Sequence, residues 1–263
     1  MDRLSPLIAN LNAEGRPRIW SLVITVFGDM VQPRGGRIST ARLGRLLGRV
    51  GIEGGALRTA LSRLSADGWV TSRREGRTSS YTLTARGQKE FGPATLRIYA
   101  PPRPGPVPVW TFTPREVPGG LPLAGGSLLP GDVAAKGVRL AGALQPGPEV
   151  WEGLPPDHRL AIERLAADLR SLSEVPDTPL DAAAARLLLV HRWRRLVLRW
   201  PEVPMELMPA GLEPRDLHGA VAVTYARLSP LAENWLDRAE ADMAAMPKAD
   251  ASVAIRFTPL QST

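Results

Sequence analysis

The stretch "GIEGGALRTALSRLSADGWVTSRREGRTSSYTLT", residues 51–84, decides the fold of this 263-residue chain. Apolar residues recur at helical spacing after Glu53, which predicts a helix whose residues 56–66 carry a polar outer face. β-Branched and aromatic residues then flank a polar turn that contains glycine, so we expect a β-hairpin with strands over 68–73 and 79–84. The stretch therefore predicts a helix followed at once by a hairpin with the basic tip "REGRTS".

Two further helices are predicted before this stretch. Apolar residues at helical spacing over 19–30 indicate the first, and "QPRGGRIS" ends it with a proline and paired glycines. Ser39 or Thr40 offers an N-cap to the second, whose apolar stripe reaches Val50. Three helices, a tight turn between the last two and a hairpin directly afterwards are typical of a winged helix-turn-helix, which we assign to residues 16–90.

The charge of the chain is concentrated in this segment. Residues 16–90 carry 14 Arg and Lys against 5 Asp and Glu, whereas residues 91–263 carry 18 against 19. The formal net charge of +7 therefore arises from the predicted winged helix. Such a distribution is expected if this segment alone meets the phosphates of a nucleic acid.

The polar side of the third helix has the chemistry of a reader of the DNA major groove. Arginine can bridge the two acceptors of guanine, and small hydroxyl residues let the helix approach closely. We predict DNA contacts from Arg58, Thr59, Ser62 and Arg63 on this helix, from Arg73, Arg74, Arg77 and Thr78 on the wing, and from Arg42 on the second helix, with Arg45 and Arg49 as further candidates. The alternative is an ordinary solvated face, or a winged helix that binds a protein.

The rest of the chain changes character twice. Residues 93–156 hold 14 prolines and 10 glycines, with short extended pieces such as "VPVWTFT" and "GVRLAGAL", so we expect a small, loop-rich, β-containing module over 91–156. Amphipathic stretches then predict a helical bundle over 157–246 for effector binding and dimerisation, with the last long helix interrupted at Pro230. The tail from Pro247 is expected to be loose. The fold class is mainly α with small β elements.

In this bundle, the stretch "DHRLAIERLAADLRSL" places four leucines near one face of the first helix. They are Leu160, Leu165, Leu169 and Leu172. We expect all four to point into the bundle.

Several classes of protein are excluded or disfavoured. The chain has no cysteine, so disulfides and thiolate metal sites are excluded. No apolar run is long enough for a membrane span and the start lacks the order of a secretory signal, so we expect a cytoplasmic protein. His158, His191 and His218 are scattered and no phosphate-binding loop is present, so no catalysis and no cofactor are predicted.

The sequence also resembles a known family, the PaaX-type transcriptional regulators. The resemblance rests on "SLVITVFGDMVQPRGGRIS", "GIEGGALRTALSRLSADGWVTSRREGRTSSYTLTARG" and "LRIY", and returns in "LLLVHRWRRLVLRWPEVPMELMPAGLEPRDL". It implies a repressor of phenylacetic acid degradation that is released by an aryl-acetyl thioester of coenzyme A, typically phenylacetyl-CoA. The family has a central ferredoxin-like module, of which residues 91–156 could be a reduced form, and an Asp-Pro where this chain has Trp200–Pro201.

A coenzyme A ligand requires cations for its phosphates and an apolar slot for its aryl group. The segment "HRWRRLVLRW" offers both, and the predicted effector residues are Arg192, Trp193, Arg194 and Arg195. The alternative is a basic outer face with a tryptophan in the core or in a dimer interface. Operator DNA bound by a symmetric homodimer is the expected partner, with a different effector, or a protein partner, as the alternative.

Overall fold

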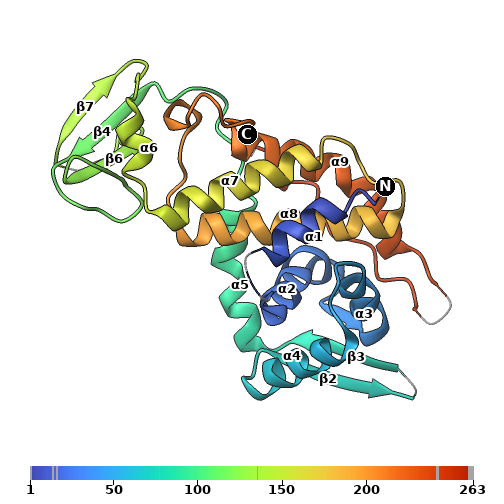
Figure 1. Cartoon of the computed structure of the whole chain (residues 1–263). Coiled ribbons are helices and arrows are strands. Elements are labelled where there is room, and N and C mark those ends of the chain that lie inside the picture. Colours follow the sequence, from blue (N-terminus) through green and yellow to red (C-terminus); the bar gives the residue numbers. More distant parts are fainter. Residues whose placement is uncertain are drawn as a thin grey trace.

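The computed structural model describes residues 2–13, 15, 17–76, 78–134, 136–240 and 243–259. Figure 1 shows three parts: a winged helix at the bottom, a body of long helices across the middle, and a small sheet at the upper left. The prediction of a mainly α fold with small β elements is confirmed.

The winged helix forms as the sequence predicts. Its elements are α2 (Ile19–Val26), η1 (Phe27–Val31), η2 (Gln32–Arg34), β1 (Arg37–Ser39), α3 (Thr40–Arg49), α4 (Gly54–Ala66), β2 (Val70–Glu75) and β3 (Thr78–Leu83). Ser39 is the N-cap of α3, since its side chain accepts a hydrogen bond from the Arg42 backbone N–H. The strand β1 was not predicted; it pairs with β3 and completes a sheet of order β1-β3-β2.

The two strands of the wing lie closer to the tip than the sequence indicates, and the tip is tighter. Arg74 pairs with Ser79 and Glu75 with Thr78, so the two strands run into the stretch predicted to be the tip. Gly76 turns the chain with a φ of +59°, a conformation that glycine adopts without strain. The strand boundaries predicted at residues 73 and 79 are therefore wrong by one or two residues, because the cross-strand ladder continues as far as the glycine permits.

A long helix, α5 (Ala85–Ile98), follows the wing and was not predicted. It passes through the expected domain boundary at residue 90 and contains Pro93 in its interior. Thr84 caps its start by accepting a hydrogen bond from the Gly87 N–H at 3.1 Å. Capping and packing against α8 (Pro179–Arg199) outweigh the helix-breaking tendency of the proline and glycines, so α5 connects the wing to the helical body (Figure 1).

The middle module is an antiparallel sheet of order β5-β6-β4-β7. Its elements are β4 (Val109–Thr113), β5 (Leu121–Leu123), β6 (Gly126–Pro130), β7 (Val138–Ala141) and the short helix α6 (Pro148–Glu152). The strands predicted in "VPVWTFT" and "GVRLAGAL" are confirmed as β4 and β7, which pair with each other. Among the described residues between β4 and β7 no helix is present, so the sheet lacks the crossover helices of a ferredoxin-like module.

The helical body consists of α1 (Ser5–Asn12), α7 (Pro156–Ser171), α8, the short η3 (Met205–Leu207) and α9 (Leu217–Asp237). Of the leucines predicted to point inward on α7, three are buried, but Leu160 is 42% exposed. The predicted interruption at Pro230 is also wrong. The helix α9 continues through it because Ala232, Trp235 and Leu236 beyond the proline are buried in the core, and this packing holds the helix together.

The prediction of a loose tail after Pro247 is wrong for the described residues. The Asp250 N–H donates to the Pro33 carbonyl at 2.8 Å, and the Phe257 N–H donates to the Tyr99 carbonyl at 3.0 Å. Phe257 packs edge-on to the ring of Tyr99, with ring centres 5.4 Å apart. This segment lacks helical periodicity, so only its tertiary contacts reveal that it is ordered.

A buried carboxylate joins the winged helix to the body and to the tail. Asp29, in η1, is fully buried and lies 2.9 Å from both the Arg186 Nε on α8 and the Arg256 Nη1 on the tail. The hydroxyls of Tyr99 and Tyr225 donate to its Oδ1. Burial alone raises the pKa of the Asp29 carboxyl, but the two guanidiniums outweigh burial and hold the pKa below its usual value. Asp29 is therefore a charged anchor shared by three parts of the chain.

Candidate functional site

The outer face of α4 presents the residues that were predicted to contact DNA. Leu57, Leu61 and Leu64 are buried against the rest of the winged helix, which turns the opposite face to solvent. Arg58, Thr59, Ser62 and Arg63 are all exposed on that face. We call these four residues the reading face.

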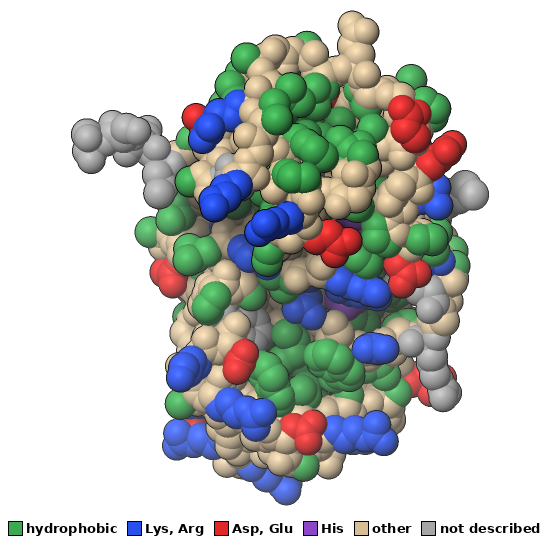
Figure 2. Space-filling view, turned by 90° about the vertical axis from the view of Figure 1, so that its left-hand side faces the viewer, with side chains coloured by type: hydrophobic (Ala, Val, Ile, Leu, Met, Phe, Trp, Pro, Cys, Tyr) green, Lys and Arg blue, Asp and Glu red, His purple; other side chains and the backbone are tan. Residues whose placement is uncertain are grey.

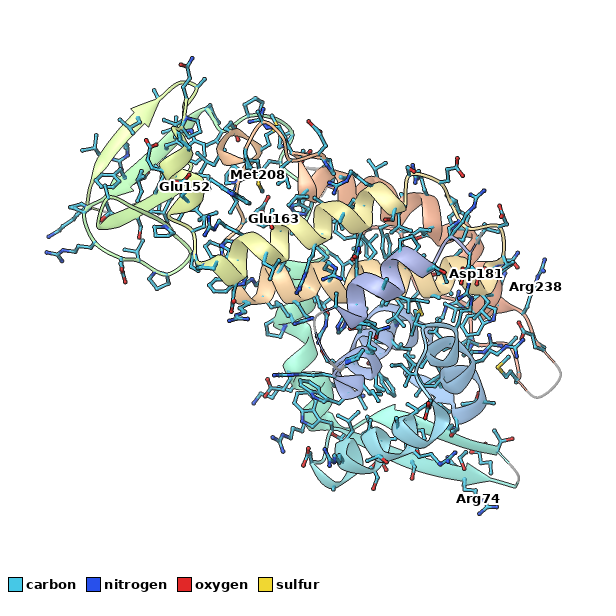
Figure 3. The ribbon with its side chains drawn as sticks, in the orientation of Figure 1. Arg74, Glu152, Glu163, Asp181, Met208 and Arg238 are labelled. Carbon is cyan, nitrogen blue, oxygen red and sulfur yellow. The ribbon has the colours of Figure 1, made fainter. Side chains whose placement is uncertain are left out.

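The wing extends the same basic surface. Arg73, Arg74 and Thr78 are exposed, and Arg77 lies outside the described residues. Arg73 is paired with Glu75 at 3.0 Å, and Arg74 donates to the Gly76 carbonyl at 3.2 Å. Figure 3 shows Arg74 pointing away from the protein at the far end of the hairpin. Figure 2 shows Lys and Arg side chains gathered around the lower end of the molecule, where the winged helix lies.

The prediction that Arg42 contacts DNA is wrong. Its side chain is 1% exposed and donates to three backbone carbonyls of the C-terminal region, those of Trp235, Arg238 and Ala244. Its guanidinium also lies over the Trp235 ring, 4.9 Å from the ring centre. Arg42 is therefore committed to the interface between the winged helix and α9 and cannot reach a phosphate.

The other two candidates on α3 differ from Arg42. Arg45 is exposed and remains available to a phosphate. Arg49 is paired with Asp2 and Asp181, and so joins α3 to the start of the chain and to α8.

The four predicted effector residues do not share one surface. Arg192 is buried and forms an ion pair with Asp168. Trp193 is 1% exposed, and its indole N–H donates to the Ile98 carbonyl at 2.7 Å. Arg194 donates to the Ser21 hydroxyl at 2.8 Å. Arg195, the fourth, is exposed. The tryptophan predicted to hold an aryl group is thus buried rather than exposed beside Arg195.

Three of these residues border a cleft of about 700 Å³ between the start of α2, α7 and α8. We call it the arginine cleft. Among the described residues, six arginines line it, namely Arg18, Arg164, Arg192, Arg194, Arg195 and Arg199, together with the one carboxylate of Asp157. Apolar side chains complete the walls, including the half-exposed Trp20 and Leu160. The cleft therefore combines an excess of positive charge with apolar surface.

The positive charge of the cleft affects the pKa of His191, which lines the cleft. Burial lowers the pKa of this imidazole well below its usual value, and the charges of Arg194, Arg195 and Arg192 lower it further. His191 therefore stays neutral, and its Nδ1 lies 3.0 Å from the Thr25 hydroxyl of α2. Because Ser21 and Thr25 both belong to α2, the wall of the cleft is hydrogen-bonded directly to the winged helix.

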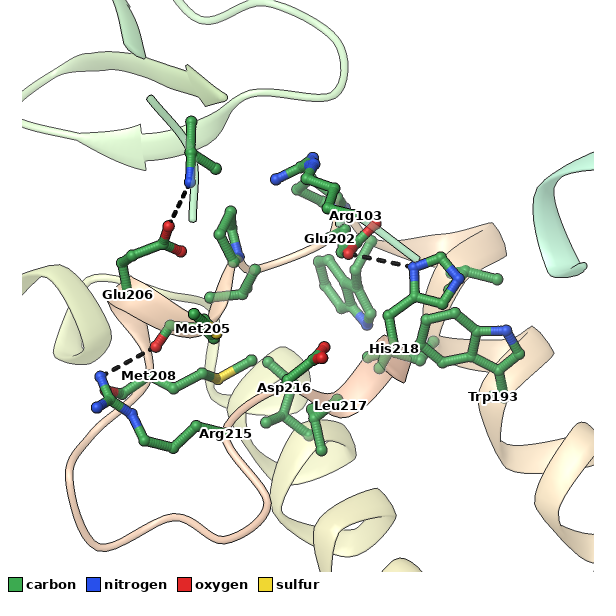
Figure 4. A pocket seen from close by; sticks show the side chains of 18 of the residues that line it. Arg103, Trp193, Glu202, Met205, Glu206, Met208, Arg215, Asp216, Leu217 and His218 are labelled. Atoms are coloured by element: carbon green, nitrogen blue, oxygen red, sulfur yellow. Dashed lines mark hydrogen bonds and ion pairs between the residues drawn. The ribbon is translucent and has the colours of Figure 1, made fainter. Parts of the chain in front are cut away.

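A second cavity of about 210 Å³ lies on the other side of the C-terminal end of α8 (Figure 4). It is bounded by the chain segment 103–107, the end of α8, the loop that contains η3, and the start of α9. His158 lines it, and the imidazole stacks on the Trp200 ring with ring centres 5.0 Å apart. We call this cavity the histidine pocket.

Sequence reasoning missed three of the six arginines of the cleft, and of the residues that line the histidine pocket it named only Trp193 as a site residue. Arg199 belongs to the basic segment "HRWRRLVLRW" of α8, whereas Arg18 and Arg164 lie far from it in the chain. Only the packing of α2 and α7 on α8 brings Arg18 and Arg164 to the cleft, so no local signal could have revealed those two. Among the described residues no cluster of metal-ligating side chains is present, and no helix has both the length and the apolar character needed to cross a membrane.

Comparisons with known proteins support both ends of the chain. Residues 18–87 match the family model described as PaaX-like protein, and residues 157–238 match that of the PaaX-like protein C-terminal domain. Together the two matches cover more than half of the chain. The chain is also 28% identical over 258 residues to the transcriptional repressor PaaX of Escherichia coli (strain K12), an alignment that covers 81% of each protein.

Proposed function

This chain belongs to the family of PaaX-like proteins, and from that premise we propose that it is a sequence-specific DNA-binding repressor. Its target is an operon for the breakdown of an aromatic acid such as phenylacetate, and it acts in the cytoplasm as a homodimer on a two-fold related operator. The observation that carries the proposal is the reading face: two arginines and two small hydroxyl residues, exposed together on α4 beside a basic wing.

In this proposal the helix α4 contacts the base edges and the wing contacts the sugar-phosphate backbone. The reading face offers donors for base edges in the major groove, where arginine bridges the O6 and N7 acceptors of guanine. The wing offers charges for the sugar-phosphate backbone, which fix position without specifying sequence. A gel shift on DNA from upstream of the gene for this chain tests the proposal: a complex that weakens steeply with salt supports it, and no complex at low salt contradicts it.

Replacing Arg73 and Arg74 by alanine is expected to weaken binding to specific and non-specific DNA by the same factor. Each phosphate contact contributes about 0.9 to the slope of log affinity against log salt. The double substitution should therefore lower that slope by about 2 units. Fluorescence anisotropy over a series of salt concentrations measures the slope, and an unchanged slope would contradict a phosphate role for the wing.

The same domain could instead bind a protein, as some winged helices do. A protein partner would be indifferent to competitor DNA, whereas phosphate contacts make the complex sensitive to polyanions. The exposed arginines of the reading face and the wing favour DNA.

Light scattering of the full chain with and without operator DNA tests the proposed dimer.

For the effector we propose an aryl-acetyl thioester of coenzyme A, with its phosphates in the arginine cleft. Guanidinium groups bind phosphate through paired, charge-assisted hydrogen bonds. Six arginines line the cleft, and Arg18 and Arg195 among them are exposed. The half-exposed Trp20 and Leu160 offer apolar surface for the aryl group. Arg194 donates a hydrogen bond to Ser21, and His191 is hydrogen-bonded to Thr25, so two residues of the cleft are bonded to α2. A ligand that moves these residues would therefore move α2 as well. Binding there would release the operator by shifting the winged helix.

Replacing Arg18 and Arg195 by alanine is expected to leave operator binding intact and to raise the phenylacetyl-CoA concentration needed for release at least tenfold. Both side chains are exposed on the cleft, and a charge-assisted hydrogen bond contributes about 1.5–3 kcal/mol. Titration of the protein–DNA complex with phenylacetyl-CoA, and with free phenylacetate as the comparison, measures the shift. Arg139→Ala, on β7 in the distant sheet, is the matched control. Release of the variant at the wild-type concentration would place the ligand elsewhere.

A further inference from the structure

The end of the chain runs from the helical body onto the winged helix. Residues 243–259, which include the tail, follow α9, and we call them the strap. We propose that the strap fixes the orientation of the winged helix on the helical body, and that operator binding depends on this orientation. The second half of this inference rests on the proposed function, whereas the first half does not. Neither the reading face nor the arginine cleft contains a residue of the strap.

The strap begins against the end of α9. The Met246 N–H donates to the Leu236 carbonyl at 3.0 Å, and the side chains of Met243 and Met246 are buried. Burial of these side chains removes apolar surface from water and stabilises the contact. The first part of the strap is therefore attached to the helical body.

Two buried arginines of the winged helix bind this first part of the strap. Arg34, in η2, donates to the Pro247 carbonyl at 2.7 Å and forms ion pairs with two carboxylates of α9. Arg42, in α3, donates to the Ala244 carbonyl at 2.9 Å. Both side chains are at most 2% exposed, so these charge-assisted hydrogen bonds are shielded from water.

The far part of the strap contacts the winged helix at other points. The Asp250 N–H donates to the Pro33 carbonyl of η2 at 2.8 Å. The Arg256 Nη1 donates to the backbone carbonyl and to the carboxylate of Asp29 in η1, both at 2.9 Å. The winged helix is therefore bound at both ends of the strap.

The same far part is also bound to α9 and to the end of α5. Arg256 donates to the Tyr225 hydroxyl of α9 at 2.6 Å, and the Phe257 N–H donates to the Tyr99 carbonyl at 3.0 Å. The Phe257 ring packs on the rings of Tyr99 and Tyr225, with ring centres 5.4 and 5.3 Å apart. The strap thus bridges the two parts of the protein.

The backbone of the strap is strained at this contact. Phe257 has a φ of +59°, in the left-handed region that bulky residues rarely adopt. Such a conformation persists only where the surrounding structure holds it, and it is common at clamps and switches. The strain indicates that the contacts of Phe257, rather than local preference, determine the path of the chain.

These contacts restrain the rotation of the winged helix. Apolar packing on α8 has no preferred direction, whereas hydrogen bonds require a defined distance and angle. The hydrogen bonds of the arginine cleft reach α2, and those of the strap reach η1, η2 and α3. The strap therefore restrains rotation about α2 and determines the direction in which the reading face points.

The first test measures the position of the winged helix on the body without DNA. The chain has no cysteine, so Ser65→Cys on α4 and Glu163→Cys on α7 supply two thiols for spin labels, both at exposed positions. Labelled chain is mixed with an excess of unlabelled chain, so that distances within one chain dominate. Pulsed electron paramagnetic resonance is expected to give one narrow distance distribution when the strap is unchanged.

Two strap variants are expected to broaden this distribution. Arg256→Lys keeps a positive charge beside Asp29 but loses the planar fork that binds several acceptors at once. Phe257→Ala removes the ring and leaves every charge of the buried network in place, so it keeps the test informative if Arg256→Lys fails to fold. Lys248→Ala changes an exposed residue of the same segment and is the control, which should keep the narrow distribution. Thermal unfolding identifies a temperature at which each variant is folded.

Operator binding by the same variants is the second test. If only a fraction of the molecules keeps the wild-type distance, the apparent operator affinity should fall in proportion, about tenfold when one molecule in ten keeps it. Affinity for a scrambled duplex should stay unchanged, because phosphate contacts by the wing carry no sequence information and do not depend on how the domain sits on the body. Fluorescence anisotropy with both duplexes measures the two affinities.

Unchanged distance distributions in both strap variants would overturn the proposal. Full operator affinity in a variant whose distribution has broadened would overturn it as well. A wild-type chain that binds no operator would contradict the proposed function instead, and the distance distributions alone would then decide whether the strap fixes the orientation.

Discussion

Replacing Arg58 and Arg63 together by alanine is expected to abolish specific operator binding while leaving the fold intact. Both side chains are exposed on the reading face and take no part in the core. A bidentate arginine–guanine contact contributes about 1–3 kcal/mol, so the loss of two predicts a reduction in operator affinity on the order of 30- to 10⁴-fold. Non-specific affinity should fall far less, because the wing retains its charges.

Anisotropy with operator DNA and with a scrambled duplex of equal length separates the two effects. Arg139→Ala is the control: it removes one positive charge from an exposed position on β7, where Arg139 pairs with the exposed Asp132. It should leave operator affinity unchanged. Wild-type operator affinity in the double variant would exclude α4 as the reading helix. A single Thr59→Ala or Ser62→Ala change should alter the preferred site more than the total affinity.

Replacing Asp29 by asparagine is expected to lower the free energy of unfolding by about 3–5 kcal/mol, the effect of removing one member of a buried ion pair. Asparagine is nearly isosteric and can still accept from Tyr99 and Tyr225, so packing is preserved. The change instead leaves Arg186 and Arg256 buried with less compensating charge. Because Asp29 joins the winged helix to α8 and to the tail, the whole chain should lose stability cooperatively.

Urea unfolding measures this loss, and Asp132→Ala is its control. Asp132 and Arg139 form an exposed pair on the sheet, and such pairs contribute about 0–1 kcal/mol. A loss from Asp29→Asn no greater than that from Asp132→Ala would show that the buried network does not hold the parts together.

The contribution of Asp29 should also depend on pH in a defined direction. The folded state holds the pKa of this carboxyl below 3.8, its usual value. A lowered folded pKa means that the unfolded chain takes up the proton first, so the stabilisation is fully present above pH 3.8 and is lost as the pH falls through the folded value. The difference in unfolding free energy between wild type and Asp29→Asn should therefore be constant near neutral pH and shrink on acidification. A difference that grew on acidification would contradict this assignment.

The two arginines Arg42 and Arg58 show which features of the DNA-binding surface can be predicted from the sequence and which cannot. Both occur in helices of a basic segment, and both were predicted to contact DNA. The structure exposes Arg58 but buries Arg42 against α9, where three backbone carbonyls accept its hydrogen bonds. Helical periodicity identifies the face that points away from the core of the same domain. It contains no information about a second domain that covers part of that face.

The same limit applies to the ligand sites and to the tail. The basic segment of α8 is visible in the sequence, but Trp193 points into the core and the remaining arginines of the cleft come from α7 and from the start of α2. His158 carries no sequence signal of its own, because only the tertiary packing buries its imidazole and stacks it on Trp200. Arg256 and Phe257 likewise lie in a segment without periodicity, yet both are buried.

The sequence by itself determined the winged helix, the basic character of that domain and the family, because caps, periodic apolar residues and turn glycines act over a few neighbouring residues. The residues of the reading face follow from the same local rules. Only the tertiary structure decided the length of α5, the roles of Arg42 and Asp29, the order of the tail, and both cavities. Each of these depends on contacts between residues far apart in the chain, and burial, ion pairing and cavity shape are set by those contacts rather than by local sequence.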